Sequence, residues 1–303
     1  MLPCQAYNII VGCHTSLCIS FPGMKPDPFV YIFPALEGTD VTTGKFKLIT
    51  VGLTFIVYAL ILLAVYLASP LSVNFKSLSD LEKFTWYTKI MKVFFFPFPI
   101  LTGFWYLAVD GTLRNDVVNG TSKTSFIALY MWVGFYILDG SLSVFGKFLF
   151  GRSYSTALFA HRVAVLTAYG GGIFYNGKGH YFVMLGFLFE MVGLLAYINW
   201  MLVKAKLDHL PIWRLIQRVS IYLWHFRTVL ALYIFYVFLK NCQYIKSELP
   251  LPIRVGVFLG TCVLLVLNTR WTENETKRLY RVSRLYSQKA VDYVSTTGRR
   301  NTL

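Results

Sequence analysis

Residues 48–68 read LITVGLTFIVYALILLAVYLA, an uninterrupted run without a charged side chain. At a helical rise of about 1.5 Å per residue the run is about 31 Å long, which matches the hydrocarbon thickness of a bilayer. The stretch therefore predicts a transmembrane helix, and it sets the class to which the whole chain belongs.

The remaining sequence repeats this pattern. The 303 residues are 56% hydrophobic and 14% charged, whereas soluble domains average about 25% charged residues. We expect an all-α membrane protein, a helical bundle of about seven spans, with Pro97 and Pro99 kinking the second. The sequence leaves open whether residues 9–21 form a partial eighth membrane segment. The further spans are expected at about 92–109, 125–146, 156–176, 180–203, 219–239 and 251–269.

Three regions follow from this pattern. Residues 1–47 form an N-terminal segment that is lumenal or partly membrane-associated, residues 48–270 form the membrane domain, and residues 271–303 form a basic cytosolic tail. This tail carries seven Lys and Arg residues against three Asp and Glu residues, within a chain of net charge +15. A basic segment beside a membrane suits anionic lipid headgroups, so membrane lipids are the expected partners and no nucleic acid is needed.

Basic residues also set the orientation of the bundle. With a lumenal N-terminus, the lumenal loops between spans carry fewer Lys and Arg residues than the cytosolic loops. The cytosolic set is Lys76, Lys83, Lys89, Lys92, Lys147, Arg152, Lys204, Lys206, Arg214 and Arg218.

The lumenal side contains the features expected of an oxidising compartment. The sequon Asn119-Gly120-Thr121 makes Asn119 a candidate glycosylation site. The sequence is equally compatible with one or two disulfides among the lumenal cysteines and with free thiols at these positions. The cysteine spacing does not fit a zinc site, so we expect no metal and no cofactor. The lumenal cysteines are Cys4, Cys13, Cys18 and Cys242.

Ionisable side chains inside the predicted spans are the candidate functional residues, because each costs at least about 2.5–3.5 kcal/mol to insert. Asp139 and His161 lie about 8–10 Å below the same membrane surface, so the carboxylate could orient and stabilise the imidazole. Glu190 lies nearer the middle, where a catalytic and a structural role are about equally expected. The other ionisable residues are Arg162, His225 and Arg227.

Structural roles compete with these functional ones. Arg162 suits a snorkelling or headgroup contact, Asp139 could form an ion pair with Arg162 or Arg227, and His225 could be a hydrogen-bonded core residue. His225 and Arg227, two positions apart, should face opposite sides, whereas Arg218 and His225 share a face. The candidate lipid-headgroup contacts are Arg162, Arg218, His225, Arg227 and His180 at the lumenal boundary.

Three stretches carry a family resemblance. FGRSYSTALFAHRVAV at 150–165, NGKGHYFVMLGFLFEMVGLLAYINWMLVKAK at 176–206 and LIQRVSIYLWHFRTVLALY at 215–233 resemble the TLC family, named for TRAM, LAG and CLN proteins. The resemblance spans about residues 50–270 and is strongest to the ceroid-lipofuscinosis branch. It implies a TLC-type bundle in the endoplasmic reticulum membrane with a role related to lipids.

The resemblance also supplies roles for individual residues. Ceramide synthases of this family use a histidine pair for acyl transfer from a coenzyme-A thioester. His161 matches the first histidine, Arg162 replaces the second, and Asp139 and Glu190 match the acidic residues of the family. The segment HYFVML after His180 lacks the aspartates of the synthases, which argues against acylation of sphingoid bases.

Two classes of function follow. The first, which the resemblance implies, is a lipid sensor or cargo receptor in lipid homeostasis and lysosomal protein trafficking, with lysosomal enzymes and vesicle coat components as expected partners. The alternative is a lipid acyltransferase with acyl-CoA as co-substrate, in which His161, Asp139 and Glu190 are catalytic. Either places it in the endoplasmic reticulum or the intermediate compartment before the Golgi. The sequence leaves open whether the chain forms a homodimer. It contains no internal repeat of the kind that is typical of transporters.

Overall fold

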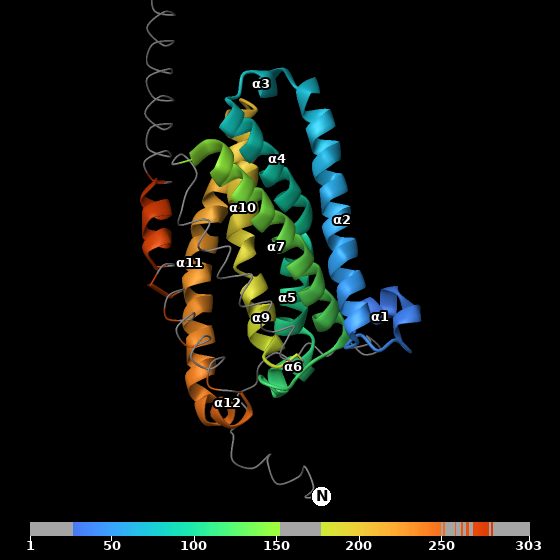
Figure 1. The fold of residues 1–303 in the computed structure, drawn as a ribbon. Helices are drawn as coiled ribbons and strands as arrows, with labels where there is room; N and C mark the ends of the chain where they lie inside the picture. Colours follow the sequence, from blue (N-terminus) through green and yellow to red (C-terminus); the bar gives the residue numbers. More distant parts are fainter. Residues whose placement is uncertain are drawn as a thin grey trace, which may run out of the picture.

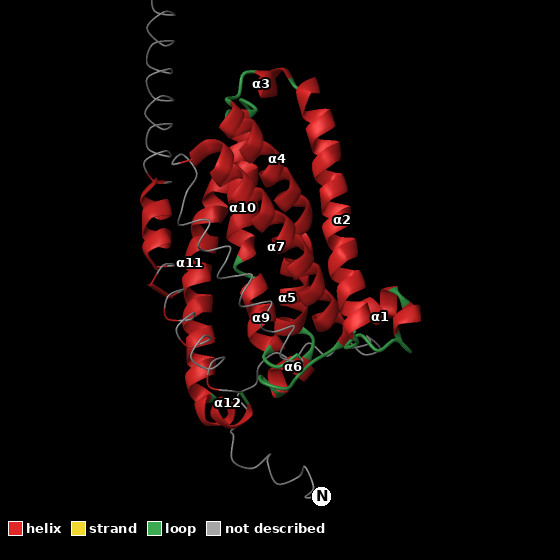
Figure 2. Ribbon diagram, in the orientation of Figure 1, coloured by secondary structure: helices red, strands yellow, loops and turns green. Residues whose placement is uncertain are grey.

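The computed structural model describes residues 27–151 and 177–249 and, beyond these, single positions and short runs between 251 and 280. All regular structure in these residues is helical, and the long helices run side by side as one bundle (Figures 1 and 2). The expected all-α membrane fold is therefore confirmed.

Five helical stretches among the described residues are long and apolar enough to cross a membrane. Each matches a span expected from the sequence. The expected span at 156–176 lies outside the described residues, and only scattered positions of 251–269 are described, so seven spans stays a prediction. The five stretches are Gly44–Leu71, Asp80–Ala108, Lys123–Phe150, His180–Lys204 and Pro211–Lys240.

The second span begins earlier than expected. Helix α4 covers Asp80–Phe95 and starts at a capping box formed by Ser79 and Glu82. The prediction of a start near residue 92 is wrong, because lysines at 83, 89 and 92 lower the hydropathy of a stretch that is nevertheless helical. Lys89 and Lys92 therefore belong to a span and not to a cytosolic loop.

Two spans are interrupted. Helix α4 stops before Phe96 and α5, Pro97–Ala108, begins at a proline, which confirms the expected kink. In the fourth described span, α9 covers His180–Phe187 and α10 covers Glu190–Lys204. The turn at 188–189 places Glu190 at the start of a new helical segment, within the interior of the bundle.

The centre of the bundle is aromatic. Helix α7, Lys123–Phe150, contributes Trp132 and Phe135, which are both fully buried. The ring of Phe135 stacks on Phe95 of α4 with 3.9 Å between centroids, and Trp132 stacks on Phe187 of α9 at 4.6 Å. Stacked rings of this kind fix the rotation of each helix about its axis, and with it the direction of the polar side chains.

Helix α2, Gly44–Ala68, packs on one side of this core and leaves most of its surface outward (Figure 1). Only 11% of its most apolar window is buried, and its buried residues are Thr54 and Tyr58. An outward surface of leucine, isoleucine and valine suits lipid tails. This face is therefore the lipid-facing side of the bundle.

The connections alternate between the two ends, as the orientation argument requires. The short helices α1 (Pro28–Ile32), α6 (Gly111–Asn115) and α12 (Cys242–Glu248) lie at one end. Helix α3 (Val73–Lys76) and the turn from α10 into α11 (Pro211–Lys240) lie at the other. In the expected orientation, the end with α12 is lumenal. The two short 3-10 turns are Pro34–Leu36 and Ser69–Leu71.

Candidate functional site

A buried ion pair lies between α4 and α7. Lys92 Nζ is 3.0 Å from Asp139 Oδ1, and the two side chains are 5% and 2% exposed. Asp139 is eleven residues from the end of α7 at Phe150, about 16 Å along the helix axis, which is deeper than the sequence suggested. An unpaired charge is costly in the interior of a membrane-spanning bundle, and here each side chain neutralises the charge of the other.

Glu190 enters the same interior from α10. The hydroxyl of Tyr136 on α7 donates to Glu190 Oε1 at 3.2 Å, and the carboxylate interacts electrostatically with Arg227, Lys92 and Asp139. The two carboxylates expected to be catalytic, Asp139 and Glu190, are thus brought together from different helices. Their catalytic role stays a prediction.

Arg227 is surrounded by aromatic rings. Its guanidinium lies 5.4 Å from the ring centroid of Phe189, 5.5 Å from that of Trp224 and 5.7 Å from that of Trp271. Its Nε has no hydrogen-bond partner among the described residues. The attraction of Glu190 and of three π faces holds this cation in the bundle.

A second line of lysines and aromatic rings runs between α4 and α10. Lys204, at the end of α10, pairs with Glu82 in the first turn of α4. Lys89 Nζ lies 4.4 Å from the ring centroid of Trp200 and 5.2 Å from that of Tyr197. We use the name lysine ladder for the set Lys92, Lys89, Lys204, Glu82, Trp200 and Tyr197. It leads from the end of the bundle to the Lys92–Asp139 pair.

The remaining predicted site residues separate from this interior. His225 and Arg218 on α11 are both exposed, whereas Arg227 is half-buried, so the expected opposite faces are confirmed. The alternative in which His225 is a core residue is wrong, since its position on α11 turns it outward. His161 and Arg162 lie outside the described residues.

His180 is enclosed. Its side chain is 0% exposed, its Nδ1 is 2.7 Å from Ser125 Oγ, and its ring meets the edge of Phe126. The imidazole therefore offers no exposed surface to a lipid headgroup in this structure. Its contact with Ser125 instead ties the start of α9 to the first turn of α7.

Sequence reasoning missed Lys89, Lys92 and Tyr136. The signal for the two lysines was their spacing, because residues three apart on a helix lie on one face and can share an environment. No group of three His, Cys, Asp or Glu side chains that could hold a metal ion occurs among the described residues.

An apolar cavity of about 370 Å³ opens on the lipid-facing side, between α2, α4 and α7. It is lined almost entirely by hydrocarbon and aromatic surface, which suits an acyl chain and not a polar molecule. Its lining residues are Ala59, Leu62, Leu63, Tyr66, Phe84, Tyr87, Thr88 and Leu142.

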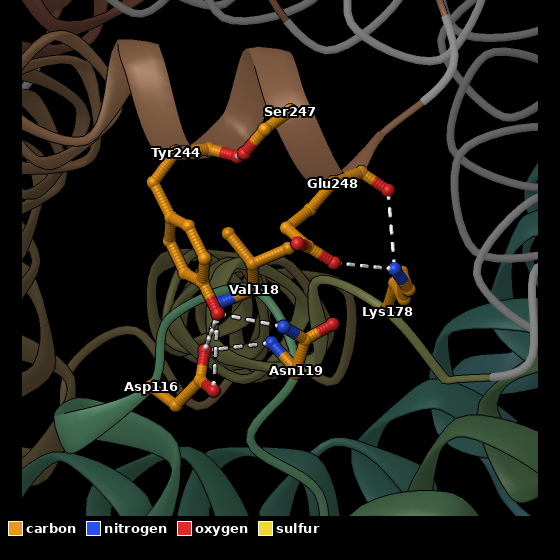
Figure 3. A network of polar contacts seen from close by, with 7 residues as sticks. All are labelled: Asp116, Val118, Asn119, Lys178, Tyr244, Ser247 and Glu248. Atoms are coloured by element: carbon orange, nitrogen blue, oxygen red, sulfur yellow. Dashed lines mark hydrogen bonds and ion pairs between the residues drawn. The ribbon is translucent and has the colours of Figure 1, made fainter. Parts of the chain in front are cut away.

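A polar network lies at the end of the bundle that carries α12, which is lumenal in the expected orientation (Figure 3). Asn119 Nδ2 donates to the hydroxyl of Tyr244 at 2.6 Å, and its backbone N–H donates to Asp116 Oδ1 at 2.8 Å. Lys178 donates to Glu248 Oε2 at 2.9 Å. These contacts join α12 to the loops before α7 and α9. Nearby Cys242 is exposed with a free thiol, and Cys4, Cys13 and Cys18 lie outside the described residues.

This network predicts acid sensitivity at the end of the bundle that carries α12. The hydrogen bond from Lys178 holds the pKa of Glu248 below its ordinary value. The pair therefore stabilises the fold above the ordinary pKa of about 4.5, and this contribution disappears as pH falls through the lower, folded value. We expect Lys178→Met to reduce the loss of thermal stability between about pH 5 and pH 3. Lys246→Met, at an exposed position of α12, the helix that carries Glu248, should leave the loss of thermal stability unchanged. An equal effect of the two variants would contradict the role of the Lys178–Glu248 pair.

Comparison with known proteins gives one consistent relationship. Protein CLN8 of dog is 27% identical over 242 residues, which cover 79% of this chain and 84% of the dog protein. Protein CLN8 of human is 26% identical over 214 residues, covering 70% and 74%. No family model and no solved structure matches the chain. The relatives confirm the resemblance indicated by the sequence motifs.

Proposed function

Because the chain is a homologue of the membrane proteins named Protein CLN8, we propose that it acts in lipid homeostasis and lysosomal protein trafficking from the endoplasmic reticulum. In this proposal it is a lipid sensor or cargo receptor that reaches the intermediate compartment before the Golgi. Its lumenal end binds lysosomal enzymes, and its cytosolic tail meets vesicle coat components. Membrane lipids occupy its lipid-facing side.

The observation that carries this proposal is the Lys92–Asp139 pair. An enzyme needs Asp139 to stabilise a positively charged imidazole at His161, but a carboxylate beside a buried ammonium has much of its charge already neutralised. A buried ion pair instead fixes the register of two helices. The apolar cavity between α2, α4 and α7 gives lipid a place at the outer surface of this fixed bundle.

Association with lysosomal enzymes tests the proposal. The tagged full chain, expressed at native level, is expected to co-purify lysosomal enzymes in excess over an unrelated multi-pass protein of the same membrane. A variant with Tyr244→Ala, which removes the hydroxyl contacts to Asn119 and Asp116, should lose this excess. The exposed Lys76→Met at the opposite end serves as the control. No enrichment of lysosomal enzymes with the unmodified chain would refute the receptor role.

The lumenal placement of Asn119 carries a second, smaller proposal, that this residue is glycosylated. An N-linked glycan replaces one of the two hydrogens on the amide nitrogen, so one remains to donate to Tyr244. A glycosidase-sensitive mobility shift that is absent from Asn119→Gln is the expected result. The same shift in Asn119→Gln would assign the glycan elsewhere.

Acyl transfer stays the second candidate function. The presence of Asp139 and Glu190 in one interior favours it, since Asp139 could orient His161 and Glu190 could serve as a second acid or base. His161 would be the nucleophile or base, and acyl-CoA the co-substrate. Brief exposure of the purified protein to a long-chain acyl-CoA should then leave an acyl adduct that is lost in His161→Ala. Consumption of the thioester by His161→Ala at the unmodified rate would exclude this mechanism.

A further inference from the structure

Lys89 is a half-buried cation of the lysine ladder for which the described residues offer no carboxylate within ion-pair distance. Its neighbours differ in this respect, because Lys92 pairs with Asp139 and Lys204 pairs with Glu82. Lys89 instead lies against the rings of Trp200 and Tyr197. Asp292 is the one acidic side chain in the sequence that lies outside the described residues.

The charge balance of the interior makes Lys89 costly. The described interior holds the cations Lys89, Lys92 and Arg227 against the carboxylates of Asp139 and Glu190. Lys89 is also repelled by Lys92 and by Arg278 near the end of the described chain. A charge inside a membrane-spanning helix requires a partner or a purpose, and the aromatic faces offset this cost only in part.

The position of Lys89 limits what the partner can be. The residue is nine positions after the start of α4 at Asp80, about 14 Å along the axis, between the Lys204–Glu82 pair and the Lys92–Asp139 pair. An ammonium carries three donors and binds phosphate as a point charge. A second ammonium, that of Lys204, lies beside Trp200 at 5.8 Å and is held there by its pair with Glu82.

We propose that Lys89, supported by Lys204 and lined by Trp200 and Tyr197, binds the phosphate group of an anionic ligand at the interface of α4 and α10. The phosphate belongs to a lipid headgroup or to a soluble phosphate compound that enters from the cytosolic end. This inference rests on the proposed function as a lipid-binding protein and names the chemistry that the interior recognises.

Retention of a phosphate lipid tests the site. The full chain is placed in nanodiscs of phosphatidylcholine with or without phosphatidic acid, and the lipids retained on release are counted by native mass spectrometry. We expect selective retention of phosphatidic acid by the unmodified chain. In Lys89→Met this selectivity should fall about tenfold or more, as is usual when one charge-assisted contact is removed. Lys83→Met, on the same helix but paired with Asp80 at the exposed end, should retain full selectivity.

A second measurement separates the two sources of phosphate. If inorganic phosphate raises the melting temperature of the unmodified chain but not of Lys89→Met, while phosphatidic acid is not selected, the ligand is soluble and the site stands. Lys89→Gln provides a second neutral variant and should behave as Lys89→Met does. Without ligand, both neutral variants should be at least as stable as the unmodified chain, because they remove a charge whose cost the aromatic faces offset only in part.

One result would overturn the site. If the unmodified chain neither selects phosphatidic acid nor is stabilised by inorganic phosphate, no phosphate binds there, whatever the variants do. This failure is distinct from failure of the proposed function, since co-purification of lysosomal enzymes is measured at the lumenal end and does not depend on Lys89.

Discussion

Replacing Lys92 with methionine is expected to destabilise the folded protein by about 3–5 kcal/mol, the usual effect of removing one partner from a buried ion pair. The reason is the carboxylate of Asp139, which is 2% exposed and would lose the ammonium at 3.0 Å. Reversible unfolding in mixed micelles measures the change. Asp139→Asn should act in the same direction, because it leaves Lys92 charged in the interior.

Two controls define this effect. The double variant Lys92→Met with Asp139→Leu removes both charges, so it should recover part of the stability lost in either single variant. Lys83→Met breaks a pair with Asp80 that is open to solvent, with side chains 32% and 90% exposed, and should change stability by less than about 1 kcal/mol. Equal stability of Lys92→Met and the unmodified chain would show that the pair does not hold α4 to α7.

The second large effect is expected at Gly134, where α7 approaches the backbone of α2. A Cβ atom at this position would lie 2.4 Å from the carbonyl oxygen of Val51 and 2.9 Å from Cβ of Thr54. The clash is with backbone, so a side-chain rotation cannot relieve it. Gly134→Val should force the helices apart and cost about 1–3 kcal/mol or more in the same unfolding measurement.

A glycine on the same helix provides the matched control. Among the residues that the structure describes, no atom lies within 4 Å of a Cβ added at Gly140. Gly140→Ala should therefore be neutral or stabilise by up to about 1 kcal/mol, since alanine is the better helix former. Destabilisation by Gly140→Ala equal to that of Gly134→Val would mean that helix packing at Val51 is not the cause.

Hydropathy was sufficient to predict the fold class and the existence of the five described spans, but not the start of the second at Asp80. The runs at 48–68 and 125–146 are long, apolar and bounded by polar residues, and their helices α2 and α7 enclose them. The kink at Pro97 was predictable for a local reason, because proline cannot continue the preceding helix. These features depend on one segment at a time.

The polar interior was harder to predict because it depends on contacts between segments. Lys92 resembled a loop residue until Asp139, on a different helix, supplied its counter-charge. Asp139 and Glu190 were identified as candidates because each lies in an apolar run, but their shared interior depends on the turn before Glu190 and on the rotation of α7. His180 was expected at a boundary and is enclosed, since Ser125 and Phe126 cover it.

The predicted receptor role makes His161 dispensable for trafficking, whereas the acyltransferase role makes it essential. The two candidate functions are both compatible with this bundle and its charged interior. The two functions differ in whether the imidazole of His161 is required for the delivery of lysosomal enzymes.

The most direct measurement is the content of lysosomal enzymes in cells that lack this protein and express either the unmodified chain or His161→Ala at matched abundance and location. We predict that enzyme content is low without the protein and is restored equally by both chains. Restoration by the unmodified chain but not by a folded, correctly located His161→Ala would contradict the receptor account and assign the function to acyl transfer.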